Sequence, residues 1–157
     1  MHIPDSYYGN QKDAIKFAEE GPFLSEKERI TGQEGLTQKE MLFLRLGVDV
    51  GQGDGELVRT RLAELVPLCS KGELKRVLAE VVLVRGERGR RLLVGALEEA
   101  SPDASWQGIS PIDLIDLAHR EQGVSLSERM AGLETLTHRE LSLLGIGITF
   151  GARCWYS

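Results

Sequence analysis

The chain has 157 residues, of which 41% are hydrophobic and 27% are charged, and its formal net charge is −5. This composition is typical of a soluble globular protein that forms one ordinary domain. No apolar run approaches the ~20 residues that a membrane-spanning helix needs, and the N-terminal residues lack the basic and apolar regions of a signal peptide. We therefore expect a single domain, residues 1–157, in the cytoplasm and away from membranes.

Helix starts are marked along the chain by a Ser or Thr that is followed three residues later by Glu. In this spacing the hydroxyl and the carboxylate each accept a hydrogen bond from a backbone N–H that the first helical turn leaves unpaired. The spacing occurs at Ser25/Glu28, Thr37/Glu40, Ser70/Glu73, Ser125/Glu128 and Thr137/Glu140. Ser110 followed by Pro111 indicates a sixth start, because proline favours the first helical position.

Helix ends are predicted from glycine and proline. Gly47 and Gly147 follow apolar helical runs, as C-terminal glycines do, and Pro67 and Gly86 interrupt two other runs. The fold class is therefore expected to be mainly α, with helices near residues 10–20, 25–33, 37–46, 56–66, 70–85, 87–100, 110–121, 125–132 and 137–146.

Two parts of the chain also allow β structure. The β-branched run Val81–Val84 could pair with Arg91–Val94, so a β-hairpin within residues 76–97 stays an alternative to helix there. Residues 47–51 and 147–151 alternate in character, and short strands are an option at both places once the preceding helices end at Gly47 and Gly147.

Residues 25–51 and 125–151 are nearly the same sequence, since they align without a gap and are identical at eleven positions. An internal repeat of this kind dictates architecture. We expect two homologous three-helix units, 4–51 and 102–151, that flank a central helical segment, 52–101. The recurring apolar pairs are expected to form the packed face: Leu36/Leu136, Met41/Leu141 and Leu44/Leu144.

Acidic residues are concentrated in the two outer units. Residues 1–51 carry nine acids and six bases, residues 52–100 carry eight acids and nine bases, and residues 101–157 carry seven acids and four bases. An acidic surface repels nucleic acid and suits a basic protein partner.

Few residues carry recognisable chemistry. The histidines His2, His119 and His138 are each expected at the surface, and Cys69 and Cys154 lack metal-ligand spacing, so reduced thiols are expected and a disulfide stays an alternative. The glycine-rich stretch 51–56 lacks the ligand spacing of an EF-hand and the lysine of a phosphate loop, and is expected to be a flexible connector. We therefore expect no catalytic, cofactor-binding or metal-binding residues and no enzymatic activity.

Candidate partner contacts come from one basic cluster and from the C-terminus. The basic residues are Arg85, Arg88, Arg90 and Arg91, and the aromatic residues are Trp155 and Tyr156, since aromatic side chains are favoured anchors at interfaces. Tyr7, Tyr8 and Trp106 also lie near unit edges, with core packing as the alternative for Tyr7 and Trp106.

The second helix of each unit also suggests a helix-turn-helix. LeuThrGlnLysGluMet (36–41) and LeuThrHisArgGluLeu (136–141) are similar to the opening of the LuxR-type DNA-binding domain over six residues each. The resemblance implies paired DNA-reading units, but the helix caps account for the same residues and both units are acidic.

The expected function is a non-enzymatic protein–protein interaction module, such as an adaptor, a regulator, a chaperone-like protein or an inhibitor. Its partner is expected to be another protein, and homo-oligomerisation is left open. The alternative is a DNA-binding transcriptional regulator, although DNA is not the expected partner.

Overall fold

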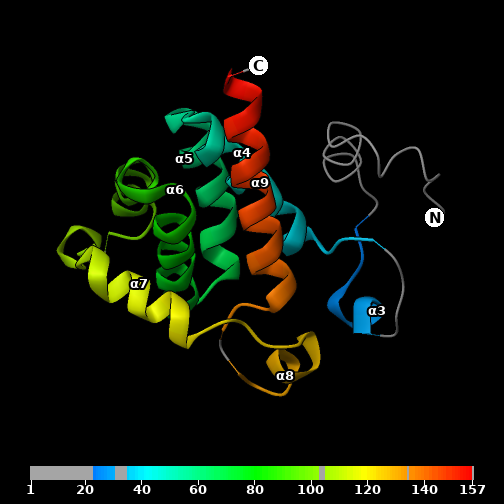
Figure 1. Cartoon of the computed structure of the whole chain (residues 1–157). Helices are drawn as coiled ribbons and strands as arrows, with labels where there is room; N and C mark the ends of the chain where they lie inside the picture. The colour runs from blue at the N-terminus through cyan, green and yellow to red at the C-terminus, as the bar shows by residue number, and fades with distance from the viewer. Residues whose placement is uncertain (1–22, 31–34, 103–104, 134, 157) are drawn as a thin grey trace.

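The protein is described here from a computed structural model, which covers residues 23–30, 35–102, 105–133 and 135–156. This part of the chain is mainly α, as predicted, and its β pairing is limited to two isolated bridges. The predicted helix at 10–20 lies outside the described residues. The helices are α3 (Glu26–Ile30), α4 (Gln38–Gln52), α5 (Gly55–Leu65), α6 (Lys71–Ala100), α7 (Pro111–Arg120), α8 (Leu126–Met130) and α9 (His138–Tyr156), with short 3₁₀ turns η1 (Val66–Leu68) and η2 (Trp106–Gly108) (Figure 1).

The predicted helix caps are confirmed. At the start of α4 the Thr37 hydroxyl accepts a hydrogen bond from the Glu40 backbone N–H (3.1 Å), and the Glu40 carboxylate accepts one from the Thr37 N–H (3.0 Å). The same reciprocal pair forms at the other four predicted sites, Ser25/Glu28, Ser70/Glu73, Ser125/Glu128 and Thr137/Glu140. Ser110 caps α7 through the Asp113 N–H (3.1 Å). These local patterns therefore set where the helices begin.

The predicted helix ends at Gly47 and Gly147 are wrong, because α4 continues to Gln52 and α9 to Tyr156. Both glycines lie where α4 and α9 pack against each other, and Figure 1 shows these two helices side by side. A Cβ on Gly47 would overlap the Leu144 carbonyl oxygen, and a Cβ on Gly147 would overlap the carbonyl oxygen of Leu44. The glycines serve to let two helix backbones touch.

The short strands considered at 47–51 and 147–151 are also wrong, since both segments are helical. Gly51 and Gly151 lie one turn after Gly47 and Gly147 and extend the same close contact, with Gly51 against Ile148 and Gly151 against Val48. Two glycines four residues apart lie on the same face of each helix. Because neither has a side chain, the two helix backbones can approach closely along this face.

Helix α4 ends instead at Gly53, which adopts the left-handed φ of 77° and donates its N–H to the carbonyls of Asp49 and Val50. Asp54 follows at once and caps α5 by accepting a hydrogen bond from the Leu57 N–H (3.1 Å). The stretch expected to be a flexible connector is therefore a tight turn between two helices.

The β-hairpin considered within residues 76–97 is wrong, because α6 covers the whole stretch. Gly86 interrupts this helix with φ 71° and ψ −151°, so the helices expected at 70–85 and 87–100 are both present on either side of the break. Gly89 then lies directly against the Val81 side chain, which shows that the second half of α6 folds back along the first.

The core gathers around α4, α6 and α9. The predicted packed face is confirmed, as Met41, Leu44, Leu136, Leu141 and Leu144 are buried and Leu36 packs against them. Trp106 is also buried, with its indole N–H donating to the Ser101 carbonyl (3.1 Å), so core packing is the correct interpretation for this residue. Within the described residues, the helices are too short or too polar for any of them to cross a membrane.

The segments that lead into α4 and α9 have the same local geometry. A single parallel bridge joins Leu24 to Thr37, and another joins Val124 to Thr137. The Leu24 N–H donates to the Leu36 carbonyl (2.7 Å), and the Val124 N–H donates to the Leu136 carbonyl (3.1 Å).

Buried charges connect these two entry segments to the start of α6. Arg129 pairs with Glu140, which is fully buried, and with Glu26 (2.6 Å). Glu73 accepts from Lys39 (2.8 Å) and lies 3.6 Å from Arg129. Burial by itself would raise the pKa of Glu73, but the hydrogen bonds from Lys39 and Ser70 outweigh it and hold that pKa below its usual range. The cluster is therefore an internal ion-pair network.

Candidate functional site: a groove between α6, α7 and α9

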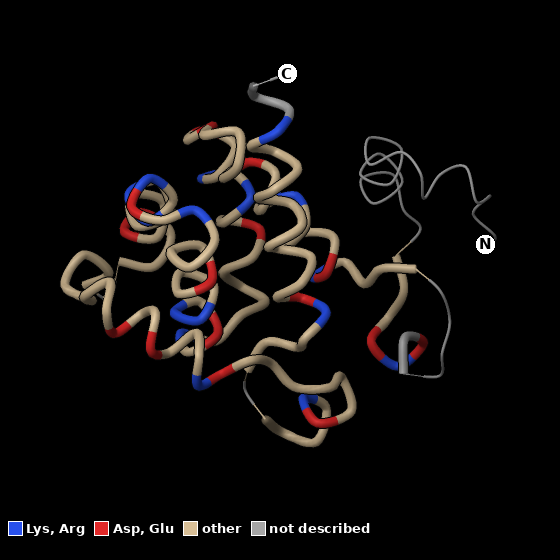
Figure 2. Tube along the Cα trace, viewed as in Figure 1, with Lys and Arg blue, Asp and Glu red and all other residues tan. Residues whose placement is uncertain are grey.

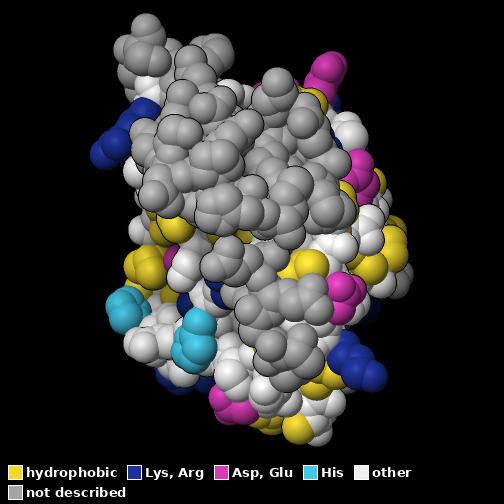
Figure 3. Space-filling model, turned by 90° about the vertical axis from the view of Figure 1, so that its right-hand side faces the viewer, with side chains coloured by type: hydrophobic (Ala, Val, Ile, Leu, Met, Phe, Trp, Pro, Cys, Tyr) yellow, Lys and Arg dark blue, Asp and Glu magenta, His cyan; other side chains and the backbone are white. Residues whose placement is uncertain are grey.

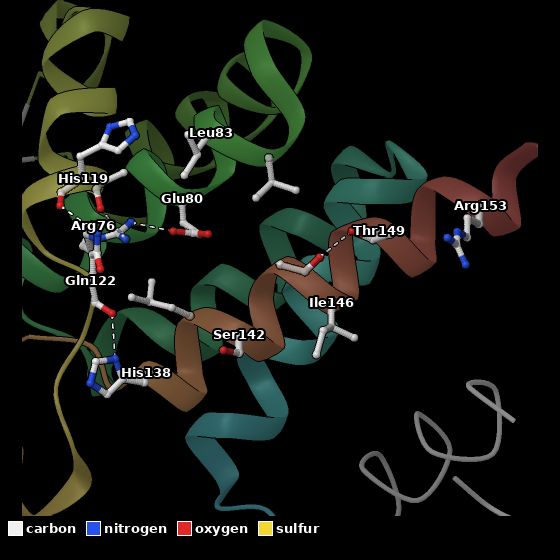
Figure 4. A pocket seen from close by; sticks show the side chains of 14 residues that line it. Arg76, Glu80, Leu83, His119, Gln122, His138, Ser142, Ile146, Thr149 and Arg153 are labelled. Carbon is white, nitrogen blue, oxygen red and sulfur yellow. Dashed lines mark hydrogen bonds and ion pairs between the residues drawn. The ribbon is translucent and has the colours of Figure 1, made fainter. Parts of the chain in front are cut away.

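An open groove of about 760 Å³ lies between α6, α7 and α9 (Figure 4). Both described histidines lie at its edge, and Figure 3 shows them in cyan with hydrophobic side chains beside them. Each of the three helices contributes a distinct wall.

The α6 wall begins with a buried ion pair and ends in exposed apolar residues. Arg76 donates to the carbonyls of Ala118 (3.2 Å) and Glu121 at the end of α7, and pairs with Glu80 at 2.9 Å. Arg76 thereby ties α7 to α6 and neutralises the carboxylate that faces the groove. Leu83 and Val84, one turn further along, are exposed.

The α7 wall carries His119 and, just after the helix, Gln122. The His119 Nδ1 lies 2.9 Å from the Ile115 carbonyl, and the His138 Nδ1 at the start of α9 lies 2.9 Å from the Gln122 carbonyl. Figure 4 shows the two imidazoles on opposite sides of Arg76 and Gln122. Each imidazole is therefore held by a different backbone carbonyl, and the two rings do not point toward a common position.

The α9 wall is formed by residues three or four positions apart, which share one helical face. These are Ser142, Gly145, Ile146, Thr149 and Arg153. The face lies opposite the glycine stripe that contacts α4. Ile146 is 54% exposed there, and a Cβ on Gly145 would meet no atom within 4 Å, so this wall is shallow and presents one large apolar side chain among polar residues.

The reactive side chains that the structure describes near the groove are not paired with one another. In the described structure, neither histidine ring hydrogen-bonds a carboxylate or a hydroxyl, which an activated nucleophile requires. Among the described residues, no three His, Cys, Asp or Glu side chains lie close enough to hold a metal ion. Cys69 lies away from the groove, and burial raises the pKa of its thiol to about 12, which disfavours the reactive thiolate.

The predicted basic contacts are not brought into the groove. Arg90 and Arg91 both bond Glu87, with Arg90 holding the carboxylate at 2.7 and 2.6 Å. Figure 2 shows basic and acidic positions close together along this part of α6. The hydrogen bond from Arg90 lowers the pKa of Glu87 to about 2. Arg85 donates to the Gly51 carbonyl (3.4 Å), and Arg88 is exposed. The cluster surrounds the break at Gly86.

The predicted aromatic contacts can be located only in part. Trp155 and Tyr156 belong to the last turn of α9, but their side chains lie outside what the structure describes. Tyr7 and Tyr8 fall outside the described residues altogether. Their role in partner contacts stays a prediction.

The residues expected to face DNA in a helix-turn-helix have partners within the protein. Lys39 bonds Glu73, and Arg139 pairs with Glu40 at 3.2 Å. Glu40 and Glu140 are buried in their caps. This geometry favours a structural role for these side chains over contact with bases.

The groove itself was not predicted from the sequence. The aligned segments 25–51 and 125–151 differ along one helical face, where Ser142, Gly145 and Ile146 stand at the positions of Leu42, Arg45 and Leu46, but this difference does not show which face stays uncovered. Comparisons with protein-family models, with curated proteins and with solved structures find no match for this chain.

Proposed function

We propose that this chain is a non-enzymatic protein-binding module whose α9 groove accepts an amphipathic helix from a partner protein. The observation that carries this proposal is the contrast between two aligned residues. Ile146 on α9 is 54% exposed, whereas Leu46 at the same position of α4 is 0% exposed.

The comparison rests on a further part of the proposal, that α4 and α9 are equivalent helices of two homologous units. Three observations support it. Both helices begin with the same threonine–glutamate cap, both follow the same single bridge, and they cross through aligned glycines. The central helices α5 and α6 then lie between the two units in sequence.

In the first unit the corresponding face is covered by helices of the same chain. Helix α4 packs against α5 and α6, and Asp49 on this face pairs with Arg61 of α5 at 3.2 Å. On α9, Ile146 and Thr149 of the corresponding face are exposed, so no described helix covers them. Among the described residues, the place that α5 fills on α4 is therefore open on α9, and a helix is the element that fits it.

The gain from filling this place is of the right size for a transient interaction. Leu83, Val84 and Ile146 are each about half exposed. Fully burying such a side chain contributes about 1.5–3 kcal/mol, so covering the remaining half contributes roughly 1 kcal/mol each. Grooves that bind helices by such anchors are a recurring mode of peptide recognition. An adaptor, a regulator, a chaperone-like protein and an inhibitor could all use it.

A display experiment tests the proposal directly. Helix-forming peptides displayed on yeast are selected for binding to the full chain, and affinities of the enriched peptides are measured by titration. Ile146→Asp removes the roughly 1 kcal/mol of apolar burial and adds the cost of covering an unpaired charge, so it should weaken binding at least about 30-fold, which corresponds to about 2 kcal/mol.

Ile112→Asp is the matched control, because Ile112 is 78% exposed on α7 and does not line the groove. This variant should bind the peptides as the wild type does. Failure to enrich any helical peptide, or equal losses in the two variants, would contradict the proposal.

A further inference from the structure

We infer that the partner helix is acidic and carries bulky apolar side chains, which deepens the proposed function and rests on it. The inference comes from the residues that α9 presents in place of those on the corresponding face of α4. They differ in both size and charge.

The difference in size concerns the middle of the groove. Ser142 and Gly145 replace Leu42 and Arg45, so α9 contributes much less volume than α4 does. The space above Gly145 is open. A partner helix that binds here must fill this space with its own side chains, because a void at the interface loses dispersion attraction. Large side chains such as Leu, Met or Phe are therefore expected where the partner crosses Gly145.

The difference in charge concerns the C-terminal end of the groove. On α4 the contact is made by an acid, Asp49, which pairs with the base Arg61. On α9 the aligned residue is the neutral Thr149, whose hydroxyl donates to the Gly145 carbonyl (3.0 Å), and the next turn carries Arg153. The face of α4 therefore carries one base and one acid, Arg45 and Asp49, whereas the corresponding face of α9 carries the base Arg153 and no acid.

No other charge in the groove cancels Arg153. Among the described residues that line it, Glu80 is the only acid, and Arg76 holds it at 2.9 Å. Within the described structure Arg153 is exposed and has no ion-pair partner, and Figure 4 shows it at the far end of α9 from Arg76. The groove is therefore locally basic on a chain of net charge −5. Charge complementarity of this kind selects partners and speeds their association, and here it favours a carboxylate.

The test uses the peptides enriched against the wild-type chain. Enriched helices should carry Asp or Glu within one turn of the apolar residue that Ile146 contacts, above its frequency in the starting library. Arg153→Glu should weaken these peptides about 3- to 10-fold at low salt, which is the range for an exposed ion pair plus the new repulsion. The loss should shrink at high salt.

A charge swap then tests the ion pair between Arg153 and the acidic residue of the peptide. A peptide whose acid is changed to Lys should bind Arg153→Glu better than the original peptide does, while binding the wild type less well. Arg120→Glu serves as the control, because Arg120 is an exposed arginine of α7 outside the groove and pairs with Asp116 (2.8 Å). Circular dichroism confirms that each variant is folded.

The outcomes separate the two proposals. Peptides that lose binding with Ile146→Asp but not with Arg153→Glu, or that are enriched in Lys and Arg, would overturn the acidic partner and leave the helix-binding groove standing. If neither variant weakens binding, the groove is not the binding site and both proposals fail. A wild-type dimer that Ile146→Asp dissociates in size-exclusion chromatography would show that a second copy fills the groove, and would also overturn the inference.

Discussion

Thr37 and Thr137 hold the starts of the two helices that form the centre of the fold. Each is buried and exchanges two hydrogen bonds with a glutamate one turn later. Changing either to Ala leaves a buried backbone N–H without a partner, so we expect a loss of about 1–2 kcal/mol in the free energy of unfolding at each site. Urea denaturation followed by circular dichroism measures the loss.

Thr60→Ala is the control for these caps. Thr60 is an exposed residue of α5 whose hydroxyl donates to the Glu56 carbonyl within the helix. Its replacement should change the free energy of unfolding by less than about 0.5 kcal/mol. Equal effects at Thr37, Thr137 and Thr60 would contradict the capping role.

Glu73 makes the stability depend on pH. Its pKa in the folded protein is lowered from 4.5, because the hydrogen bonds from Lys39 and Ser70 outweigh its burial. A lowered pKa means that the stabilisation is present above about pH 4.5 and is lost as the pH falls through the lower value. Glu73→Gln should therefore cost roughly 1.5–3 kcal/mol at pH 7, and the cost should shrink in acid.

Unfolding measured between pH 7 and pH 3 checks this prediction. Glu121→Gln is the control, since the Glu121 side chain is exposed after α7 and no ion pair is found for it in the described structure. Its cost should be small at every pH. A cost of Glu73→Gln that stays constant across the range would show that the carboxylate charge is not what stabilises the fold.

The helix starts could be predicted from the sequence because a cap involves residues three positions apart. Nothing outside Ser25–Glu28 or Thr37–Glu40 is needed to form the two hydrogen bonds. The partners of Lys39 and Arg129 were not predictable in this way, because Glu73 and Glu26 reach them only through the tertiary fold.

At the scale of elements, the crossing of α4 and α9 is the contact most sensitive to side-chain size. A methyl group on Gly47 or Gly147 would overlap a backbone carbonyl of the other helix. We expect Gly47→Ala and Gly147→Ala to destabilise the protein by about 1–3 kcal/mol, because a packed backbone contact cannot absorb the added group without moving apart.

Gly95→Ala should have the opposite sign. Gly95 lies inside α6, where an added Cβ would meet no atom within 4 Å. Alanine is favoured over glycine in a helix by about 1 kcal/mol, so this variant should be more stable than the wild type. Thermal melts of the three variants side by side provide the measurement. A gain at Gly47 similar to that at Gly95 would show that the helices do not touch there.

The error at Gly47 and Gly147 has a physical cause. A glycine after an apolar run can end a helix by adopting positive φ, or it can continue the helix and admit a neighbour. The local sequence is the same in both cases, and only the presence of the opposite helix decides. Gly53, which does end α4, is the residue that takes positive φ.

At the scale of the molecule, one cooperative unit is expected. The core is built from α4 of the first segment, α6 of the middle and α9 of the last, so no part can be removed without exposing the others. Urea unfolding should therefore show coincident transitions by fluorescence and circular dichroism. Two separated transitions would indicate that the segments fold independently.

The mainly helical class and the packed face could be predicted from periodicity and caps, but the groove could not. Its position depends on which faces remain uncovered after packing. The sequence shows that Ile146 replaces Leu46 and gives no sign that Leu46 lies beneath neighbouring helices while Ile146 does not.

The contact of bare backbones at Gly47 and Gly147 has a consequence for recognition. A contact between two backbones has no side-chain rotamers that could rearrange, so α4 holds α9 in a fixed position. The outer surface of α9 therefore has the same shape before and after a partner binds. Binding then costs less free energy of reorganisation, because the binding surface is preorganised. Association should therefore be limited by encounter.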